Sequence, residues 1–135
     1  RKRQAHLTLT VIEELKRLGK GLGLEADEVL GLAWELGKES LCAETPGVNE
    51  AGEEVVGMSV APALLPEGFS EDGPQGNPPE LEEVEAKERI ALSMSPRAAK
   101  EVEELAFFSD RSMSWCLHEA FLRARASLWA RIALP

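Results

Sequence analysis

The chain repeats itself, and this repeat limits its possible folds more than any other feature. When residues 1–41 are aligned with residues 87–135 at an offset of 87, apolar residues fall on apolar residues. The matched pairs are Val11 with Ala98, Leu15 with Val102, Leu18 with Leu105, Val29 with Cys116, Leu30 with Leu117, Ala33 with Ala120, Trp34 with Phe121 and Leu41 with Leu128. In each copy these residues lie three or four positions apart, which is typical of helix faces. A unit of about 40 residues rarely folds alone, so we expect the two copies to share one core.

At the start of each copy, the spacing of apolar residues is two rather than three or four. Apolar and polar residues alternate over residues 4–9 and again over residues 89–94, which predicts a half-buried strand at each place. Helix starts follow both strands. Thr10 with Glu13 fits a capping box, and Ser95 before Pro96 fits an N-cap followed by proline.

The order strand, helix, turn, helix therefore occurs twice. The turns are expected at residues 19–23, where glycines following a helix favour a helix stop over a phosphate-binding loop, and at residues 108–111. Because a single strand has no partner within its own copy, we expect the two strands to pair antiparallel under four helices. The predicted fold is mainly α with a two-stranded antiparallel ribbon.

Charge and composition separate the copies from a linker at residues 42–86. This segment holds eleven acidic residues, no basic residue and six of the eight prolines. It therefore accounts for the excess of acidic over basic residues that gives the chain its net charge of −9. It is either a solvated connector or a polyanion that competes with phosphate. Residues 55–65 are apolar enough to form a short strand or to dock, and residues 79–86 either begin a helix or stay solvated.

The second copy resembles the ribbon-helix-helix superfamily of MetJ, Arc and CopG type. The resemblance covers residues 88–125 and rests on the strand before Pro96 and on the turn Asp110-Arg111-Ser112 before the second helix. Residues 3–41 resemble the same pattern more weakly. Because family members normally dimerise, the resemblance implies that this chain is a tandem pseudo-dimer.

The resemblance also implies a sequence-specific DNA-binding protein, a transcriptional regulator or repressor whose ribbon reads the major groove of double-stranded DNA. The outward strand residues would contact bases: Gln4, His6, Thr8, Arg89, Ala91 and Ser93. Arg suits guanine, Gln suits adenine, and a Thr or Ala methyl suits thymine. Phosphate contacts would come from the start of the last helix and from a basic N-terminal arm: Arg111, Ser112, Met113, Arg1, Lys2 and Arg3. At the matching helix start of the first copy, Glu25 would repel a phosphate.

An apolar stripe on the last helix has no counterpart in the first copy. Trp115, Leu122 and Trp129 lie seven residues apart, whereas Glu28 and Glu35 occupy the first two matching positions. Either residues 55–65 cover this stripe, or it is an interface for a protein partner or for self-association. The alternative function is therefore a protein-binding adaptor that keeps the fold without binding DNA.

The remaining residues argue against other functions. Cys42 is expected in the linker and Cys116 in the core, and with only two histidines no metal cluster, cofactor site or enzymatic nucleophile-base pair is predicted. His6 serves either as a surface residue or as a base contact, and His118 is expected on a helix surface. No segment is apolar over a membrane span, and two cysteines without a disulfide pattern favour a reducing cytoplasm. The family resemblance further implies a bacterial protein associated with the nucleoid.

Overall fold

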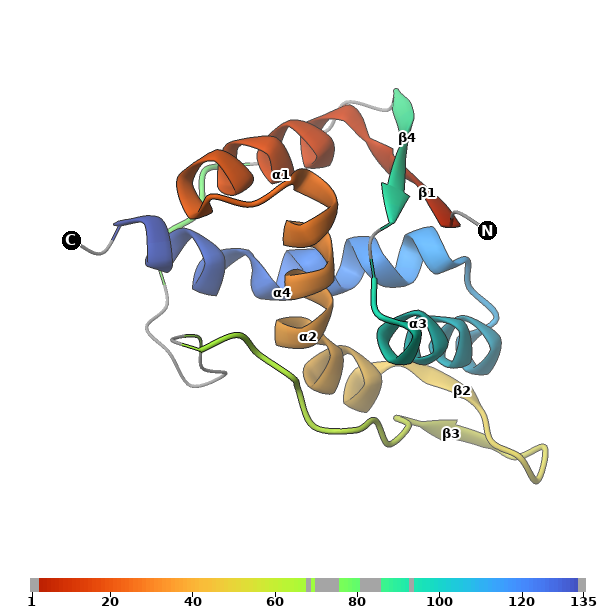
Figure 1. Ribbon diagram of the computed structural model, residues 1–135. Coiled ribbons are helices and arrows are strands. Elements are labelled where there is room, and N and C mark those ends of the chain that lie inside the picture. The colour runs from red at the N-terminus through yellow and green to blue at the C-terminus, as the bar shows by residue number, and fades with distance from the viewer. Residues whose placement is uncertain (1–2, 68, 70–75, 81–85, 93, 134–135) are drawn as a thin grey trace.

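The computed structural model describes residues 3–67, 69, 76–80, 86–92 and 94–133. Its helices and strands, shown in Figure 1, are β1 (Arg3–Thr8), α1 (Leu9–Leu22), α2 (Ala26–Glu44), β2 (Pro46–Val48), β3 (Glu54–Val56), β4 (Lys87–Leu92), α3 (Pro96–Ser109) and α4 (Met113–Ala133). The chain is mainly helical, and strands from its two ends form a small antiparallel sheet. These two features of the predicted fold are confirmed.

The ribbon joins β1 to β4. Ala5 lies opposite Ile90, His6 opposite Arg89 and Leu7 opposite Glu88. Ala5 and Leu7 are buried while His6 is exposed, so β1 alternates as its sequence predicts. In Figure 1 the ribbon lies at the upper right, with the first turns of α4 below it.

Caps fix where the strands end and the helices begin. Ser95 caps α3 by accepting a hydrogen bond from the Ala98 N–H, as predicted. The prediction for α1 was wrong, because Thr8 rather than Thr10 is the N-cap. The Thr8 hydroxyl accepts from the Val11 N–H at 3.4 Å, so the helix begins directly where the strand ends.

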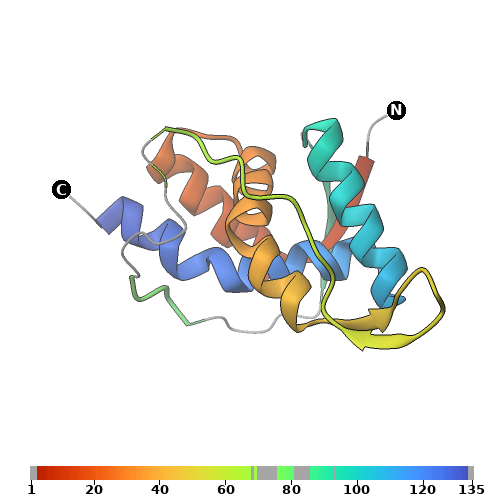
Figure 2. The same ribbon diagram turned by 90° about the horizontal axis from the view of Figure 1, so that it is seen from below.

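The core includes every residue that the repeat matched. All sixteen are buried, with Trp34 on α2 and Phe121 on α4 among the largest fully buried side chains. The helices that carry them, α2 and α4, cross near the middle of the molecule and make the most extensive helix contact (Figures 1 and 2). The two halves therefore share one hydrophobic core.

Gly37 is the point of closest approach in this crossing. A Cβ there would lie 2.4 Å from the Ala120 carbonyl oxygen, which is backbone and has no rotamer to change. We expect Gly37→Ala to lower the free energy of unfolding by about 1–3 kcal/mol through overpacking. Gly31→Ala in the same helix is the control. It meets nothing within 4 Å and should gain up to about 1 kcal/mol from helix propensity. Equal effects of the two substitutions in urea unfolding would contradict this account.

Two ion pairs with buried carboxylates also join the halves. Lys38 on α2 is fully buried, and its Nζ lies 2.9 Å from Glu101 Oε1 on α3 and 2.8 Å from Glu35 Oε1. Arg125 on α4 contacts Glu14 on α1 through two hydrogen bonds. These pairs are copies of each other, since Glu14 and Lys38 become Glu101 and Arg125 at the same offset of 87. Each pair links the second helix of one half to the first helix of the other.

Both cysteines are buried free thiols. Burial raises the pKa of Cys42 and of Cys116 to about 11, so both stay protonated at neutral pH and pack as small apolar residues. The core position predicted for Cys116 is confirmed. The linker position predicted for Cys42 was wrong, because α2 continues to Glu44. Thr45 is the C-cap of this helix, and its hydroxyl donates a hydrogen bond to the Leu41 carbonyl.

The segment after α2 contains a β-hairpin and further hydrogen bonds to the helices. Strands β2 and β3 form an antiparallel hairpin against α3. Beyond it, Met58 N–H donates to the Cys42 carbonyl and Leu64 N–H to Glu35 Oε1, while Arg97 of α3 donates to the Pro62 carbonyl. Both expectations for residues 55–65 are therefore met, since part is strand and the rest docks on α2 and α3. Most of residues 79–86 lie outside the described part of the chain.

Candidate nucleic-acid interface

The outward face of the ribbon is set by the strand register. His6 lies opposite Arg89, Gln4 opposite Ala91 and Thr8 opposite Lys87. Residues that face each other across an antiparallel pair project from the same side. His6 and Arg89 are exposed and Thr8 is half-buried, so these predicted base-contact residues gather on one side of the ribbon.

Some of the predicted contacts cannot be placed. Arg1, Lys2 and Ser93 lie outside the described residues, and the side chains of Arg3, Gln4 and Ala91 are likewise outside them. The base-contact and phosphate-contact roles of all the predicted residues, placed or not, stay predictions.

Lys87 is the residue that sequence reasoning missed. It is exposed and shares the outward face with Thr8 and, two positions along its own strand, with Arg89. The signal was present, because alternation extended one step before Arg89 gives Lys87. Its ammonium adds a cation at the end of the ribbon where Thr8 caps α1.

A hollow of about 240 Å³ joins the ribbon to the start of α4. Its lining combines predicted base-contact and phosphate-contact residues with neighbours: His6, Leu7, Thr8, Lys87, Ser112, Ser114, Trp115 and His118. The backbone N–H of His6 donates to Ser114 Oγ at 2.9 Å, which ties the strand edge to the helix. The lining holds Lys87, two imidazoles and several hydroxyls and no carboxylate. Such a lining suits an anion.

The start of α4 is held by a capping hydrogen bond and by a cation–π contact. Ser112 Oγ accepts from the Trp115 N–H at 3.0 Å, and the Arg111 guanidinium lies over the Trp115 ring at 4.9 Å from its centre. The first N–H groups of a helix have no intrahelical acceptor, and the helix dipole makes this end positive. Ser112, Met113 and Arg111 thus occupy a position where a phosphate would be favoured.

The corresponding site of the first half is closed. Glu25 and Glu28 form a capping box at the start of α2, which satisfies these N–H groups with carboxylates. The hollow beside it is lined by Glu28, Glu35, Leu64 and Pro66, so the connecting segment forms part of its wall. The two ends of the ribbon therefore differ in charge and in access.

No family model, curated protein or solved structure matches this chain.

The stripe on α4 is only partly exposed. Trp129 is partly buried, with the Arg17 guanidinium 5.3 Å from its ring centre, and Leu122 remains 36% exposed. The described hydrogen bonds of residues 58–64 run to α2 and α3, since Glu35 on α2 accepts the Leu64 N–H. Cover of Trp115, Leu122 and Trp129 by residues 55–65 stays a prediction.

Within the described ranges, no group of three or more His, Cys, Asp or Glu residues could hold a metal ion. His118 is half-buried beside Glu119, with 3.4 Å between Nδ1 and Oε2. Over the same part of the chain, every helix is too short or too polar to cross a bilayer.

Proposed function

We propose that this protein binds double-stranded DNA sequence-specifically, as a transcriptional repressor of ribbon-helix-helix type with both half-units in one chain. It would act at the nucleoid in a bacterial cytoplasm. The ribbon would enter the major groove, with Arg89 and His6 at base edges. Ser112, Met113 and Arg111 would hold a backbone phosphate, and the other predicted contacts would join them.

The tandem arrangement has three supports. The order strand, helix, helix occurs at both ends of the chain, and the two strands pair with each other. The ion pairs Lys38–Glu101 and Glu14–Arg125 exchange roles between the halves at one constant offset. Helices α2 and α4, at matched positions, cross at the centre. Each feature is expected of two half-units related by an approximate two-fold axis.

The observation that carries the DNA proposal is the joining of two surfaces. The exposed outward face of the ribbon, with His6 and Lys87, continues into the hollow at the start of α4. A duplex seated on that face would meet base-reading side chains and a phosphate position together. The net charge of −9 does not oppose this, because the acids concentrate in the connecting segment.

The adaptor alternative is favoured by Leu122, whose side chain reaches solvent. Its neighbours on the stripe are less available, since Arg111 stacks on Trp115 and Arg17 on Trp129 and both rings are partly buried. The described part of α4 therefore presents no continuous apolar face of three residues. DNA binding is the function that we propose.

Lys87→Ala tests the backbone part of this function. Loss of one phosphate contact should weaken binding to every duplex alike and reduce the slope of log affinity against log salt by about one. Fluorescence anisotropy with unrelated duplexes over a salt series measures both quantities. Lys20→Ala, which removes an exposed charge near the end of α1, should leave the slope unchanged. A wild-type chain that binds no duplex even at low salt would contradict the proposed function.

A further inference from the structure

A groove lies between the β2–β3 hairpin and α3, away from the ribbon. It encloses about 860 Å³, and its apolar lining consists of Val48, Val55, Met58, Phe107 and Phe108. In Figure 1 the hairpin and α3 lie at the lower right while the ribbon lies above them. This surface is thus separate from the one proposed for DNA.

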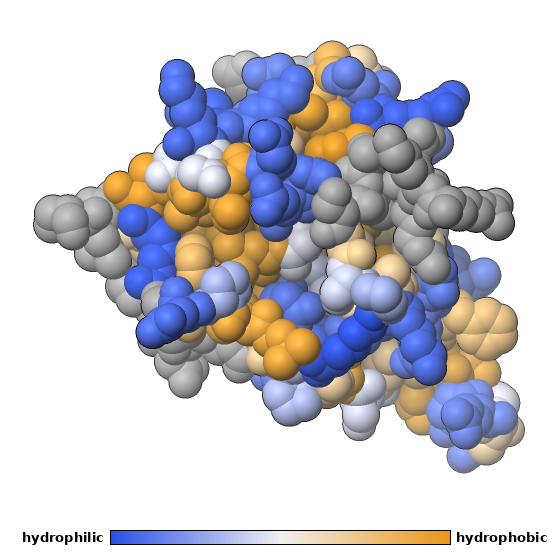
Figure 3. Space-filling model, viewed as in Figure 1, coloured by the Kyte–Doolittle hydropathy of each residue, from blue (hydrophilic) through white to orange (hydrophobic). Residues whose placement is uncertain are grey.

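Two apolar side chains at this groove are exposed. Phe107 on α3 is 91% exposed and Val48 on β2 is 49% exposed. Scattered apolar residues are common on surfaces, but these two line the same hollow. Orange residues lie among blue ones in this region of the space-filling view (Figure 3).

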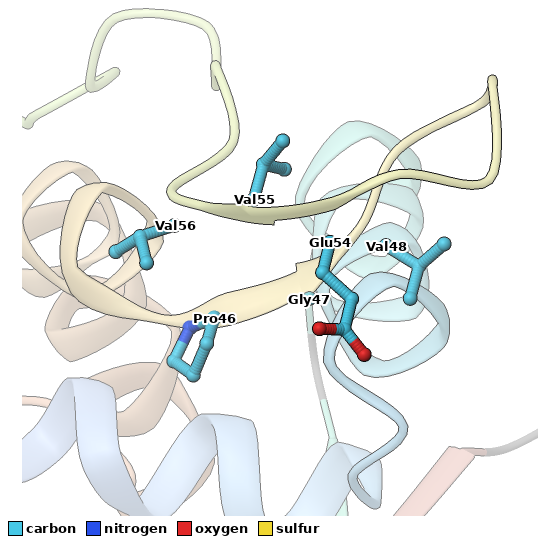
Figure 4. A pocket seen from close by; sticks show the side chains of 6 residues that line it. All are labelled: Pro46, Gly47, Val48, Glu54, Val55 and Val56. Atoms are coloured by element: carbon cyan, nitrogen blue, oxygen red, sulfur yellow. The ribbon is translucent and has the colours of Figure 1, made fainter.

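The apolar surface continues around the hairpin. Pro46 pairs with Val56, and Val48 pairs with Glu54, in the two strands of the hairpin. Figure 4 shows these side chains around the two strands, with Val55 projecting from the opposite side. Val56 is 73% exposed, so the hairpin presents apolar groups on the side away from the groove as well.

The hairpin is held rigidly, which gives the groove a preformed shape. The Asn49 side-chain oxygen accepts from the N–H groups of Ala51 and Glu53 and closes the turn. Gly47 packs so closely on Phe108 that a Cβ would lie 2.3 Å from its carbonyl oxygen. Gly57, at φ 93°, reverses the chain, and its N–H donates to the Thr45 carbonyl. A partner would therefore meet little ordering cost here.

The charges of the groove select the partner. Its lining includes Glu50, Glu103 and Glu104 against the single base Lys100, and Glu50 and Glu104 are exposed. Glu53 and Glu54 are also exposed on the hairpin, and Glu54 lines the hollow on its other side. A carboxylate rim repels nucleic acid and acidic peptides and attracts Lys and Arg.

We infer that this groove binds a basic segment of a partner protein, whose apolar side chains enter between the hairpin and α3. The flanking Lys or Arg residues of the segment pair with Glu50 and Glu104. Apolar anchors in a groove with charged flanks are a recurring mode of peptide recognition. The inference does not depend on DNA binding, since the two surfaces share no residue.

Selection of random phage-displayed peptides on the full-length chain tests this inference. The enriched peptides should combine apolar anchors with an excess of Lys and Arg, and salt should weaken their binding. Phe107→Ser should reduce the affinity of an enriched peptide about tenfold or more, as at interface hot spots. Glu104→Lys should also reduce the affinity, because it reverses one charge of the acidic rim. Both residues are exposed, so the fold, checked by circular dichroism, should be unchanged.

Matched variants separate the groove from general attraction to an acidic protein. Leu122→Ser removes another exposed apolar side chain, and Glu13→Lys reverses another exposed acid, both outside the groove. Neither should change peptide affinity by more than about twofold. The inference is overturned by no enrichment, by an acidic consensus, or by peptides that bind Phe107→Ser as well as wild type. It is also overturned if sedimentation shows self-association that Phe107→Ser abolishes, because the occupant is then a second copy.

Discussion

Replacing Lys38 with methionine should lower the free energy of unfolding by about 3–5 kcal/mol, the usual cost of breaking a buried ion pair from one side. The Lys38 ammonium is fully buried and contacts both oxygens of Glu101, at 2.9 and 3.0 Å. Without it, Glu101 keeps a hydrogen bond from Trp34 Nε1 and a long contact of 3.8 Å with Arg97. Neither replaces the lost charge, so a carboxylate is left in the core with incomplete compensation.

Urea unfolding followed by circular dichroism measures this effect. Lys16→Met is the matched control, because Lys16 is an exposed lysine of α1 and its loss should change stability by less than about 0.5 kcal/mol. The double variant Lys38→Met/Glu101→Leu should recover much of the loss, since it removes both charges together. A loss below about 1 kcal/mol in Lys38→Met would show that the network does not hold the halves together.

Arg89→Ala should cost about 1–3 kcal/mol of specific DNA binding, roughly five- to 150-fold in affinity. Arg89 is exposed on the outward face of the ribbon, where its guanidinium can donate two hydrogen bonds to one guanine. Its removal takes nothing from the core, so thermal stability should stay unchanged. The preference for one base pair should relax, whereas loss of a backbone contact would weaken all sequences equally.

Competition binding at one fixed salt concentration separates these effects. The affinities for a preferred duplex and for an unrelated duplex are measured with wild type, Arg89→Ala and Lys20→Ala. Arg89→Ala should lose affinity mainly for the preferred duplex. Lys20→Ala should bind both duplexes as the wild type does. Equal losses on both duplexes in Arg89→Ala would assign this residue to the phosphate backbone.

Much of the fold was predictable because the same pattern of apolar positions occurs at both ends of the chain. Matching of apolar positions identified the core, and period-two alternation identified both strands. The ion pairs were missed because Glu14, Lys38, Glu101 and Arg125 are residue types usually found in solvent. Their shared offset of 87 was the available signal. The hairpin was not predictable, since strands of three residues are too short to show a period.

The candidate site was predictable in part. Alternation gave His6, Thr8 and Arg89 their outward positions, and the turn before the last helix located Ser112. Alternation extended from Arg89 also reaches Lys87, but its position opposite Thr8 depends on the strand register, which sequence periodicity does not fix. The apolar content of residues 55–65 indicated docking but not on which helix. Whether the acids of the connecting segment compete with DNA stays a prediction.

An unbiased selection of duplexes bound by the full-length chain, at one stated moderate salt concentration, tests the central proposal most directly. We expect one enriched motif without two-fold symmetry, because the outward residues of β1 and β4 differ and only one end of the ribbon opens on a cationic hollow. The selection repeated with Arg89→Ala should lose the preference at one base pair of that motif. No enriched motif with the wild-type chain would contradict sequence-specific DNA binding, and the adaptor function would take its place.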